Sequence, residues 1–124
     1  GGMDVSFPHC HHCTPERIAR ILPRLKGLTL VLAHLGGYNY LDDVERLLVG
    51  KDLYLDTSFT LGRFGREQIL RIIRNHRPDR LLFGTDSPWE DQQSAVSAVK
   101  DLPIDASLKD KILYENAAGL LKLE

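Results

Sequence analysis

The chain has 124 residues, 43% hydrophobic and 27% charged, a composition typical of one globular domain with a core of its own. Its formal net charge of −1 gives no long-range attraction for nucleic acid or an anionic membrane, and no apolar run approaches the roughly 20 residues that span a bilayer. The first residues lack the pattern of a signal peptide and the two cysteines lie too close together to close a large loop, so we expect a cytoplasmic protein.

The predicted elements alternate between helix and strand. Thr14, Pro15 and Glu16 have the pattern of a helix start, and this first helix is expected to kink or end at Pro23 and to stop at Gly27. Apolar runs predict three buried parallel strands, over residues 28–34, 52–57 and 80–84. Further helices are predicted over residues 40–49, 65–75, 92–100 and 105–121, the last N-capped by Asp105 or Ser107.

This order predicts an α/β fold in which crossover helices join the strands of a parallel sheet. Three strands, or four if residues 3–6 end another, make a very small sheet with two open edges. A complete (β/α)8 TIM barrel takes about 250 residues, so the chain has about half of that length. Two interpretations follow: an independent small α/β domain, or half of a barrel that needs a partner.

Two of the predicted strands lead into side chains that bind metals. The run 28–34 ends in His34, followed by Gly36, and the run 80–84 is followed by Asp86. Because the carboxyl ends of parallel strands meet at one edge, both side chains are expected where α/β folds bind ligands and metals. The alternatives are a buried structural histidine and ordinary turn chemistry at residues 85–88.

The segment Pro8-His9-Cys10-His11-His12-Cys13 admits several interpretations. It offers the donor types of a structural zinc site and the CxxC spacing of a redox motif. It lacks a second knuckle and a thioredoxin-like context, so we favour a polar loop that lines the mouth of the site.

Two further polar residues follow or interrupt apolar segments. Asp56 could be the phosphoacceptor of a receiver domain, but only Asp4 and Lys100 are candidates for the other residues such a domain needs, and neither is well placed. We therefore expect Asp56 to face the same edge as His34 and to form hydrogen bonds or shape the substrate pocket. Asn116 is expected to bond the backbone of a neighbouring loop.

Four short motifs in register resemble the carboxyl-terminal half of amidohydrolase-superfamily proteins, of the amidohydrolase 2 type related to decarboxylating barrels. They are Leu32-Ala33-His34-Leu35-Gly36-Gly37, Leu53-Tyr54-Leu55-Asp56-Thr57-Ser58, Leu82-Phe83-Gly84-Thr85-Asp86-Ser87-Pro88-Trp89 and Glu115-Asn116-Ala117-Ala118. The resemblance implies a metal-dependent (β/α)8 barrel. Residues 1–124 then form a single domain, a half-barrel from the end of strand five to strand eight plus the terminal helix.

The resemblance also implies roles for particular residues. His34 matches the metal-binding histidine that ends strand six, and Asp86 matches the aspartate that binds metal and acts as the catalytic base after strand eight. His11 and His12 match no ligand position. The positions predicted to contact substrate are Asp4, Asp56, Trp89 and Gly36.

The implied cofactor is a divalent metal, zinc first, with manganese or iron as alternatives. Asp4 lies in the tail of the strand-five motif, whose metal-binding histidine would fall before residue 1, so only His34 and Asp86 occupy ligand positions. A catalytic zinc site has three protein ligands. We therefore predict that this chain alone binds metal poorly and is inactive.

Three hypotheses for function remain. The leading one is half of a metal-dependent hydrolase that cleaves C–N or C–O bonds of a small molecule, or decarboxylates an aromatic acid. The second is a non-catalytic half-barrel that dimerises through its open sheet edges, and the third is an open-sheet signalling or binding domain. As partners we expect a second copy of the chain or the missing amino-terminal half, and neither nucleic acid nor a membrane.

Overall fold

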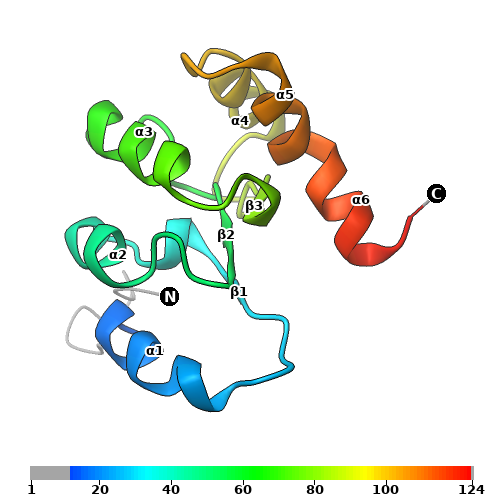
Figure 1. Cartoon of the computed structure of the whole chain (residues 1–124). Coiled ribbons are helices and arrows are strands. Elements are labelled where there is room, and N and C mark those ends of the chain that lie inside the picture. The colour runs from blue at the N-terminus through cyan, green and yellow to red at the C-terminus, as the bar shows by residue number, and fades with distance from the viewer. Residues whose placement is uncertain (1–11, 124) are drawn as a thin grey trace.

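The structure is a computed structural model and describes residues 12–123. Three parallel strands pair in the order β1-β2-β3, namely β1 (Val31–Leu32), β2 (Tyr54–Asp56) and β3 (Leu81–Leu82). Figure 1 shows the helices fanned around the strands, with α1 below, α2 and α3 to the left and α4 and α5 above. The predicted α/β architecture, a parallel sheet with crossover helices, is confirmed.

The helices fall where the sequence predicts them, with one interruption. The α-helices are α1 (Pro15–Ile21), α2 (Leu41–Leu47), α3 (Arg66–Asn75), α4 (Gln92–Lys100), α5 (Ala106–Asp110) and α6 (Asn116–Leu121). Short 3₁₀ turns occur at η1 (Leu22–Arg24), η2 (His34–Gly36) and η3 (Pro78–Arg80), and a π turn, η4 (Lys111–Glu115), joins α5 to α6. Within residues 12–123, no helix combines the length and apolar character that crossing a bilayer requires.

Side-chain caps fix where several helices begin. The Thr14 hydroxyl accepts the backbone N–H of Arg17 at 3.4 Å, and the Asp105 carboxylate accepts that of Leu108 at 2.8 Å. Asp105, rather than Ser107, is therefore the N-cap of the last helical segment. These bonds satisfy N–H groups that the first helical turn leaves without partners.

The last segment differs from the single predicted helix because of the π turn η4. A π turn adds a residue to the helical repeat, which the 3.6-residue spacing of apolar residues does not reveal. Directly after it, the Asn116 amide donates to the carbonyl oxygens of Pro78 and Leu81, both at 2.8 Å. The expected bonding of Asn116 to a neighbouring backbone is thus confirmed, and it ties α6 to the start of β3.

The sheet has one well-covered face and one that is partly open. Leu32, Leu55 and Leu81 stand in register and are at most 6% exposed, so this face is packed within the hydrophobic core. On the other face, Val31 pairs with Tyr54 and remains 44% exposed. In the described part of the chain, β1 and β3 each pair on one side only, so both edges of the sheet are open.

The strands are shorter than the apolar runs that predicted them. The run 28–34 contributes only Val31–Leu32 to the ladder, although the carbonyl of Leu30 still accepts the Tyr54 N–H at 2.8 Å. An edge strand can form backbone hydrogen bonds with a neighbour on one side only. β1 ends at Leu32, and the 3₁₀ turn η2 begins at His34. The apolar pattern indicates which residues are buried in the core, and this burial extends beyond the residues that pair in the sheet.

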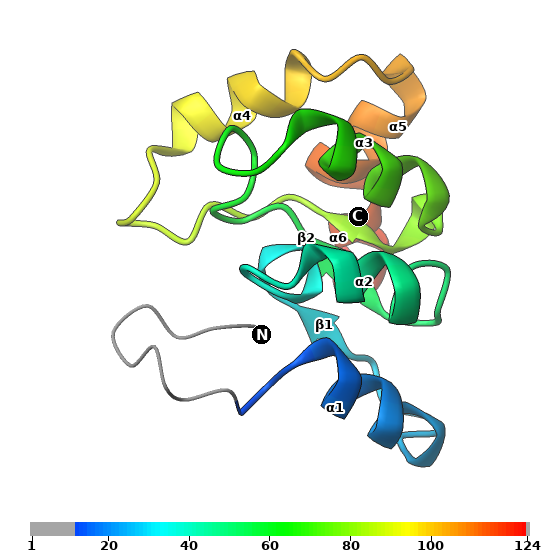
Figure 2. The same cartoon turned by 90° about the vertical axis from the view of Figure 1, so that its left-hand side faces the viewer.

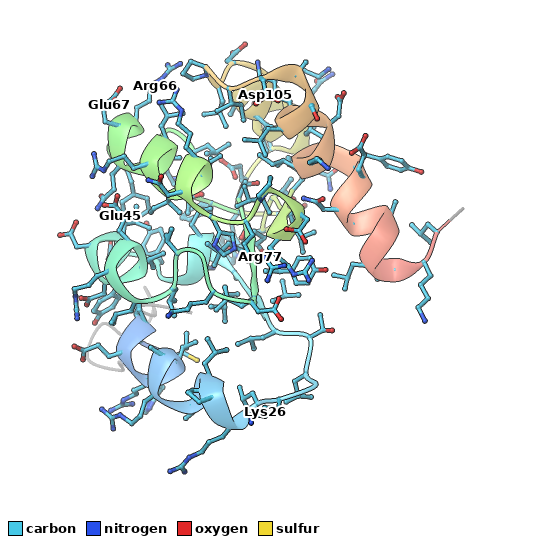
Figure 3. All side chains as sticks on the ribbon, in the orientation of Figure 1. Lys26, Glu45, Arg66, Glu67, Arg77 and Asp105 are labelled. Carbon is cyan, nitrogen blue, oxygen red and sulfur yellow. The ribbon has the colours of Figure 1, made fainter. Side chains whose placement is uncertain are left out.

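Ion pairs link neighbouring helices on the outer surface. Glu45, labelled in Figure 3 between α2 and α3, accepts Arg71 Nε at 2.8 Å, and this guanidinium holds the pKa of the Glu45 carboxyl below its usual range. Asp52 pairs with Arg77 at 3.0 Å, and Arg77 is also labelled there. Water screens exposed pairs of this kind, so each contributes little to stability, and we give these pairs no part in function.

His76 gives the fold a pH-dependent element. Its ring is 3% exposed, Nδ1 accepts the Gly50 N–H at 3.0 Å, and Nε2 lies 3.0 Å from the Leu53 carbonyl oxygen, to which it donates. This pairing uses both nitrogens of a neutral imidazole. Desolvation, reinforced by Arg77, lowers the pKa of His76 below 6.5 despite the opposing bond to Leu53.

Stability should therefore fall as the pH drops through the ordinary histidine range. Between the lowered pKa of His76 in the folded protein and the unfolded value near 6.5, the unfolded chain binds more protons than the folded chain, so the free energy of unfolding rises with pH. Above this pH window the contribution of His76 to stability is complete. Urea titrations from neutral to mildly acidic pH should show this slope. His76→Gln, which keeps one donor and one acceptor without titrating, should flatten it; an equal slope in both proteins would refute the assignment.

Candidate active site at the carboxyl edge of the sheet

Strained backbone collects where the strands end. Among the described non-glycine residues with positive φ, His34 (59°) and Leu35 (50°) follow β1, Phe59 (51°) follows β2 and Asp86 (57°) follows β3. Figure 2 shows the loops after β2 and β3 extending to the left before α3 and α4 run back. Such conformations cost energy and persist where the surroundings enforce them, often at functional sites. This edge of the sheet is therefore the candidate site.

His34 is held from the neighbouring strand by its backbone and its ring. Its N–H donates to Asp56 Oδ1 at 2.9 Å. Its Nδ1 lies 3.0 Å from the carbonyl oxygen of Ser58 and 3.1 Å from the Ser58 hydroxyl. The histidine predicted from the end of the first strand is thus fixed by Asp56, the last residue of β2, and by Ser58, which follows β2.

Asp56 is the centre of this arrangement. Besides His34, its Oδ1 accepts the Ser58 N–H at 3.0 Å and the Ser58 hydroxyl at 2.5 Å. Gly84, in the segment after β3, leaves the room that this cluster needs. A Cβ added to Gly84 would stand 3.2 Å from both Asp56 Cγ and Ser58 Cβ, tighter than an ordinary van der Waals contact.

Asp86 follows β3 and His34 follows β1, so the central strand β2 separates the two residues along the edge of the sheet. Its side chain is exposed, and its carbonyl accepts the Trp89 N–H at 2.9 Å. Trp89 itself is 74% exposed. Next to it, Glu90 Oε2 accepts the Phe59 N–H at 3.1 Å, which ties the loop after β3 to the loop after β2.

Aromatic rings form a wall beside His34. Tyr38 meets the His34 ring edge-on at 6.0 Å between centroids, and it also contacts Phe59 at 5.8 Å and Phe64 at 5.1 Å. The Arg63 guanidinium lies 3.6 Å from the Phe59 ring centroid, a cation–π contact. These contacts join Tyr38, which follows β1, to Phe59 and Phe64, which follow β2.

The described residues do not complete a metal site. No group of three or more His, Cys, Asp or Glu side chains within residues 12–123 is arranged to hold an ion. The predicted ligands His34 and Asp86 fall short of the three protein ligands of a catalytic zinc. Asp4, Cys10 and His11 lie outside the described residues.

The other predicted residues differ in what surrounds them. His12 and Cys13 are exposed and precede α1. Gly36 is buried, and an added Cβ would stand 3.0 Å from Leu55 Cδ2, so core side chains surround it. Whether Gly36, Asp56 and Trp89 contact a substrate stays a prediction.

Ser58 is the residue of the site that sequence reasoning missed. The sequence shows it only as the third residue of the polar run Asp56-Thr57-Ser58 after an apolar strand, and nothing in that run distinguishes Ser58 from its neighbours. Thr57 and Ser58 are both buried, at 2% and 4% exposure, which is unusual for polar residues after a strand.

The chain matches a family model described as amidohydrolase over residues 5–123. Among solved structures, it resembles a manganese-bound dihydroxybenzoic acid decarboxylase from Polaromonas sp. JS666, with 22% identity and a TM-score of 0.64 over 88% of this chain and 40% of that one. It also resembles a zinc-bound amidohydrolase from Burkholderia multivorans, with 16% identity and a TM-score of 0.68 over 89% of this chain and 49% of that one.

A 5-carboxyvanillate decarboxylase from Sphingomonas paucimobilis gives 16% identity and a TM-score of 0.63, over 88% of this chain and 39% of that one. No curated protein matches the chain. The chain spans less than half the length of these three structures. This partial coverage agrees with the half-barrel fold predicted from the sequence.

Proposed function

This chain belongs to the amidohydrolase family, and from that premise we propose that it supplies His34 and Asp86 to the active site of a metal-dependent hydrolase. The observation that carries the proposal is their position: each lies in the segment that follows a strand of the same parallel sheet, and each has positive φ. The remaining ligands would come from residues outside the described part.

In this proposal Asp86 is the general base. Its carboxylate is exposed at the end of β3, so it is free to take a proton from the attacking water and return it to the leaving group. His34 would hold the metal through its imidazole. We propose zinc as the metal, with manganese or iron as alternatives; the related structures with zinc and manganese support a divalent ion of this kind.

The substrate we propose is a small aromatic or heterocyclic acid. Two of the related structures are decarboxylases of aromatic acids by name, and the wall of Tyr38, Phe59 and Phe64 offers ring contacts, with Arg63 at its margin. The reaction is either hydrolysis of a C–N or C–O bond or loss of carbon dioxide. We place the protein in the cytoplasm because its two cysteines close no large loop.

The test uses the protein together with the amino-terminal half that its solved relatives possess. It should release carbon dioxide from a benzoic acid, or cleave an amide, ester or lactone, in a panel covering these classes. Chelation should abolish the activity and added zinc or manganese should restore it. Activity that survives complete metal removal, or no activity in a metal-loaded protein across the panel, would argue against the proposal.

A second candidate is an assembly unit without catalysis. Both edges of the described sheet are open, and Val31 on its partly open face is 44% exposed. Open parallel edges favour pairing, either with a second copy or with an amino-terminal half. Sedimentation of the chain alone should show a dimer or larger species, whereas a well-behaved monomer would argue against this candidate.

A further inference from the structure

The hydrogen bonds around His34 allow its protons to be assigned. Asp56 Oδ1 lies 2.9 Å from His34 N and 3.0 Å from Ser58 N, and both of these groups can only donate. Oδ1 is therefore an acceptor. The Ser58 hydroxyl, at 2.5 Å from the same oxygen, must donate its single proton to it.

That assignment leaves His34 facing two acceptors. Because the Ser58 proton points at Asp56, the hydroxyl presents a lone pair to His34 Nδ1 at 3.1 Å. The Ser58 carbonyl oxygen, at 3.0 Å from Nδ1, is an acceptor by nature. A bare Nδ1 would face two lone pairs, so only a proton on Nδ1 satisfies the geometry.

We propose that Asp56 and Ser58 are positioning residues that fix His34 as the Nδ1–H tautomer and so leave the Nε2 lone pair as its reactive side. Asp56 acts through Ser58, whose hydroxyl it orients. It also acts directly, because its bond to His34 N supports the left-handed backbone at φ 59°.

This arrangement suits the role proposed for His34. Metal-binding histidines generally donate their other ring N–H to a carbonyl or carboxylate, which fixes the ring and its tautomer. Here the partners would be the carbonyl and the carboxylate-oriented hydroxyl of Ser58. The catalytic meaning rests on the proposed function, but the tautomer is a property of the chain alone and needs neither metal nor substrate.

Two-bond ¹H–¹⁵N correlation NMR on the ¹⁵N-labelled chain reports which ring nitrogen carries the proton. At a pH where His34 is neutral, the wild-type protein should show Nδ1 protonated and Nε2 bare. An unconstrained histidine favours the opposite tautomer in water, so the expected pattern is diagnostic. A predominantly Nε2–H ring, or a mixture, would overturn the proposal without any variant being made.

Variants separate the parts played by the two residues. Asp56→Asn keeps an acceptor oxygen and should retain the Nδ1–H pattern. Asp56→Ala frees the Ser58 proton to turn toward Nδ1 and should shift the population toward Nε2–H; adding Ser58→Ala removes that donor and should restore Nδ1–H. A folded Asp56→Ala protein with the wild-type pattern would overturn the role given to Asp56, as would an Asp56→Asn protein that loses it.

The NMR readout does not depend on turnover. A failure of the tautomer inference can therefore be distinguished from a failure of the proposed function. A protein that is inactive with the Nδ1–H ring intact would reject the function alone. An active metal-dependent protein with the other tautomer would reject only this inference.

Discussion

In the chain combined with the amino-terminal half, replacing Asp86 by asparagine is expected to lower kcat by about 10²- to 10⁴-fold, the usual contribution of a positioned general base. Asparagine has nearly the same shape as aspartate but cannot take up the proton. The Asp86 side chain is exposed and the bond that its residue makes to Trp89 uses the backbone carbonyl, so the fold should not suffer. Measurement of kcat together with the melting temperature separates the two effects.

The matched control is Asp110→Asn, the same change at another exposed position, on α5. It should leave kcat unchanged. Metal content refines the result: loss of kcat with metal retained indicates the base, and loss of both indicates a ligand as well. An Asp86→Asn protein as active as the control would remove Asp86 from the mechanism.

Replacing Gly36 by alanine should destabilise the fold by about 2–5 kcal/mol. The φ of +90° at Gly36 is costly for a residue with a side chain, and the added Cβ would stand 3.0 Å from Leu55 Cδ2 and 3.3 Å from Leu48 Cδ1. Left-handed backbone costs about 1–2 kcal/mol and overpacking of a core about 1–3 kcal/mol, which together give the range. The free energy of unfolding in urea measures the loss.

Gly62 provides the control for Gly36. Its φ is +80°, close to that of Gly36, but nothing lies within 4 Å of an added Cβ. Gly62→Ala should therefore cost only the conformational term, about 1–2 kcal/mol. Equal losses for the two substitutions would show that the core around Leu55 yields to the new methyl group and that packing does not explain the glycine.

Local signals predicted the helices well because the physics that starts a helix is local. Thr14 and Asp105 cap the helices they were expected to cap, each through a bond to an N–H three residues on. The π turn η4 was not predictable in this way. It coincides with the anchoring of Asn116 to Pro78 and Leu81, more than thirty positions away in the sequence.

The candidate site was predictable only in part. The apolar strands pointed to His34 and Asp86, because a polar residue directly after a buried strand stands out in a sequence. Ser58 lacked such a signal, since its importance lies in the proton that it shares between Asp56 and His34, two side chains from different strands. Gly84 likewise gains its meaning from the space that Asp56 and Ser58 occupy.

Zinc titration of the 124-residue chain, with turnover measured in parallel, tests most directly whether the chain holds only part of a metal site. We predict weak binding, reduced by His34→Asn and by Asp86→Asn, and no turnover, because two ligand positions do not make a catalytic zinc site. Stoichiometric tight binding of zinc, with turnover that Asp86→Asn abolishes, would contradict this prediction.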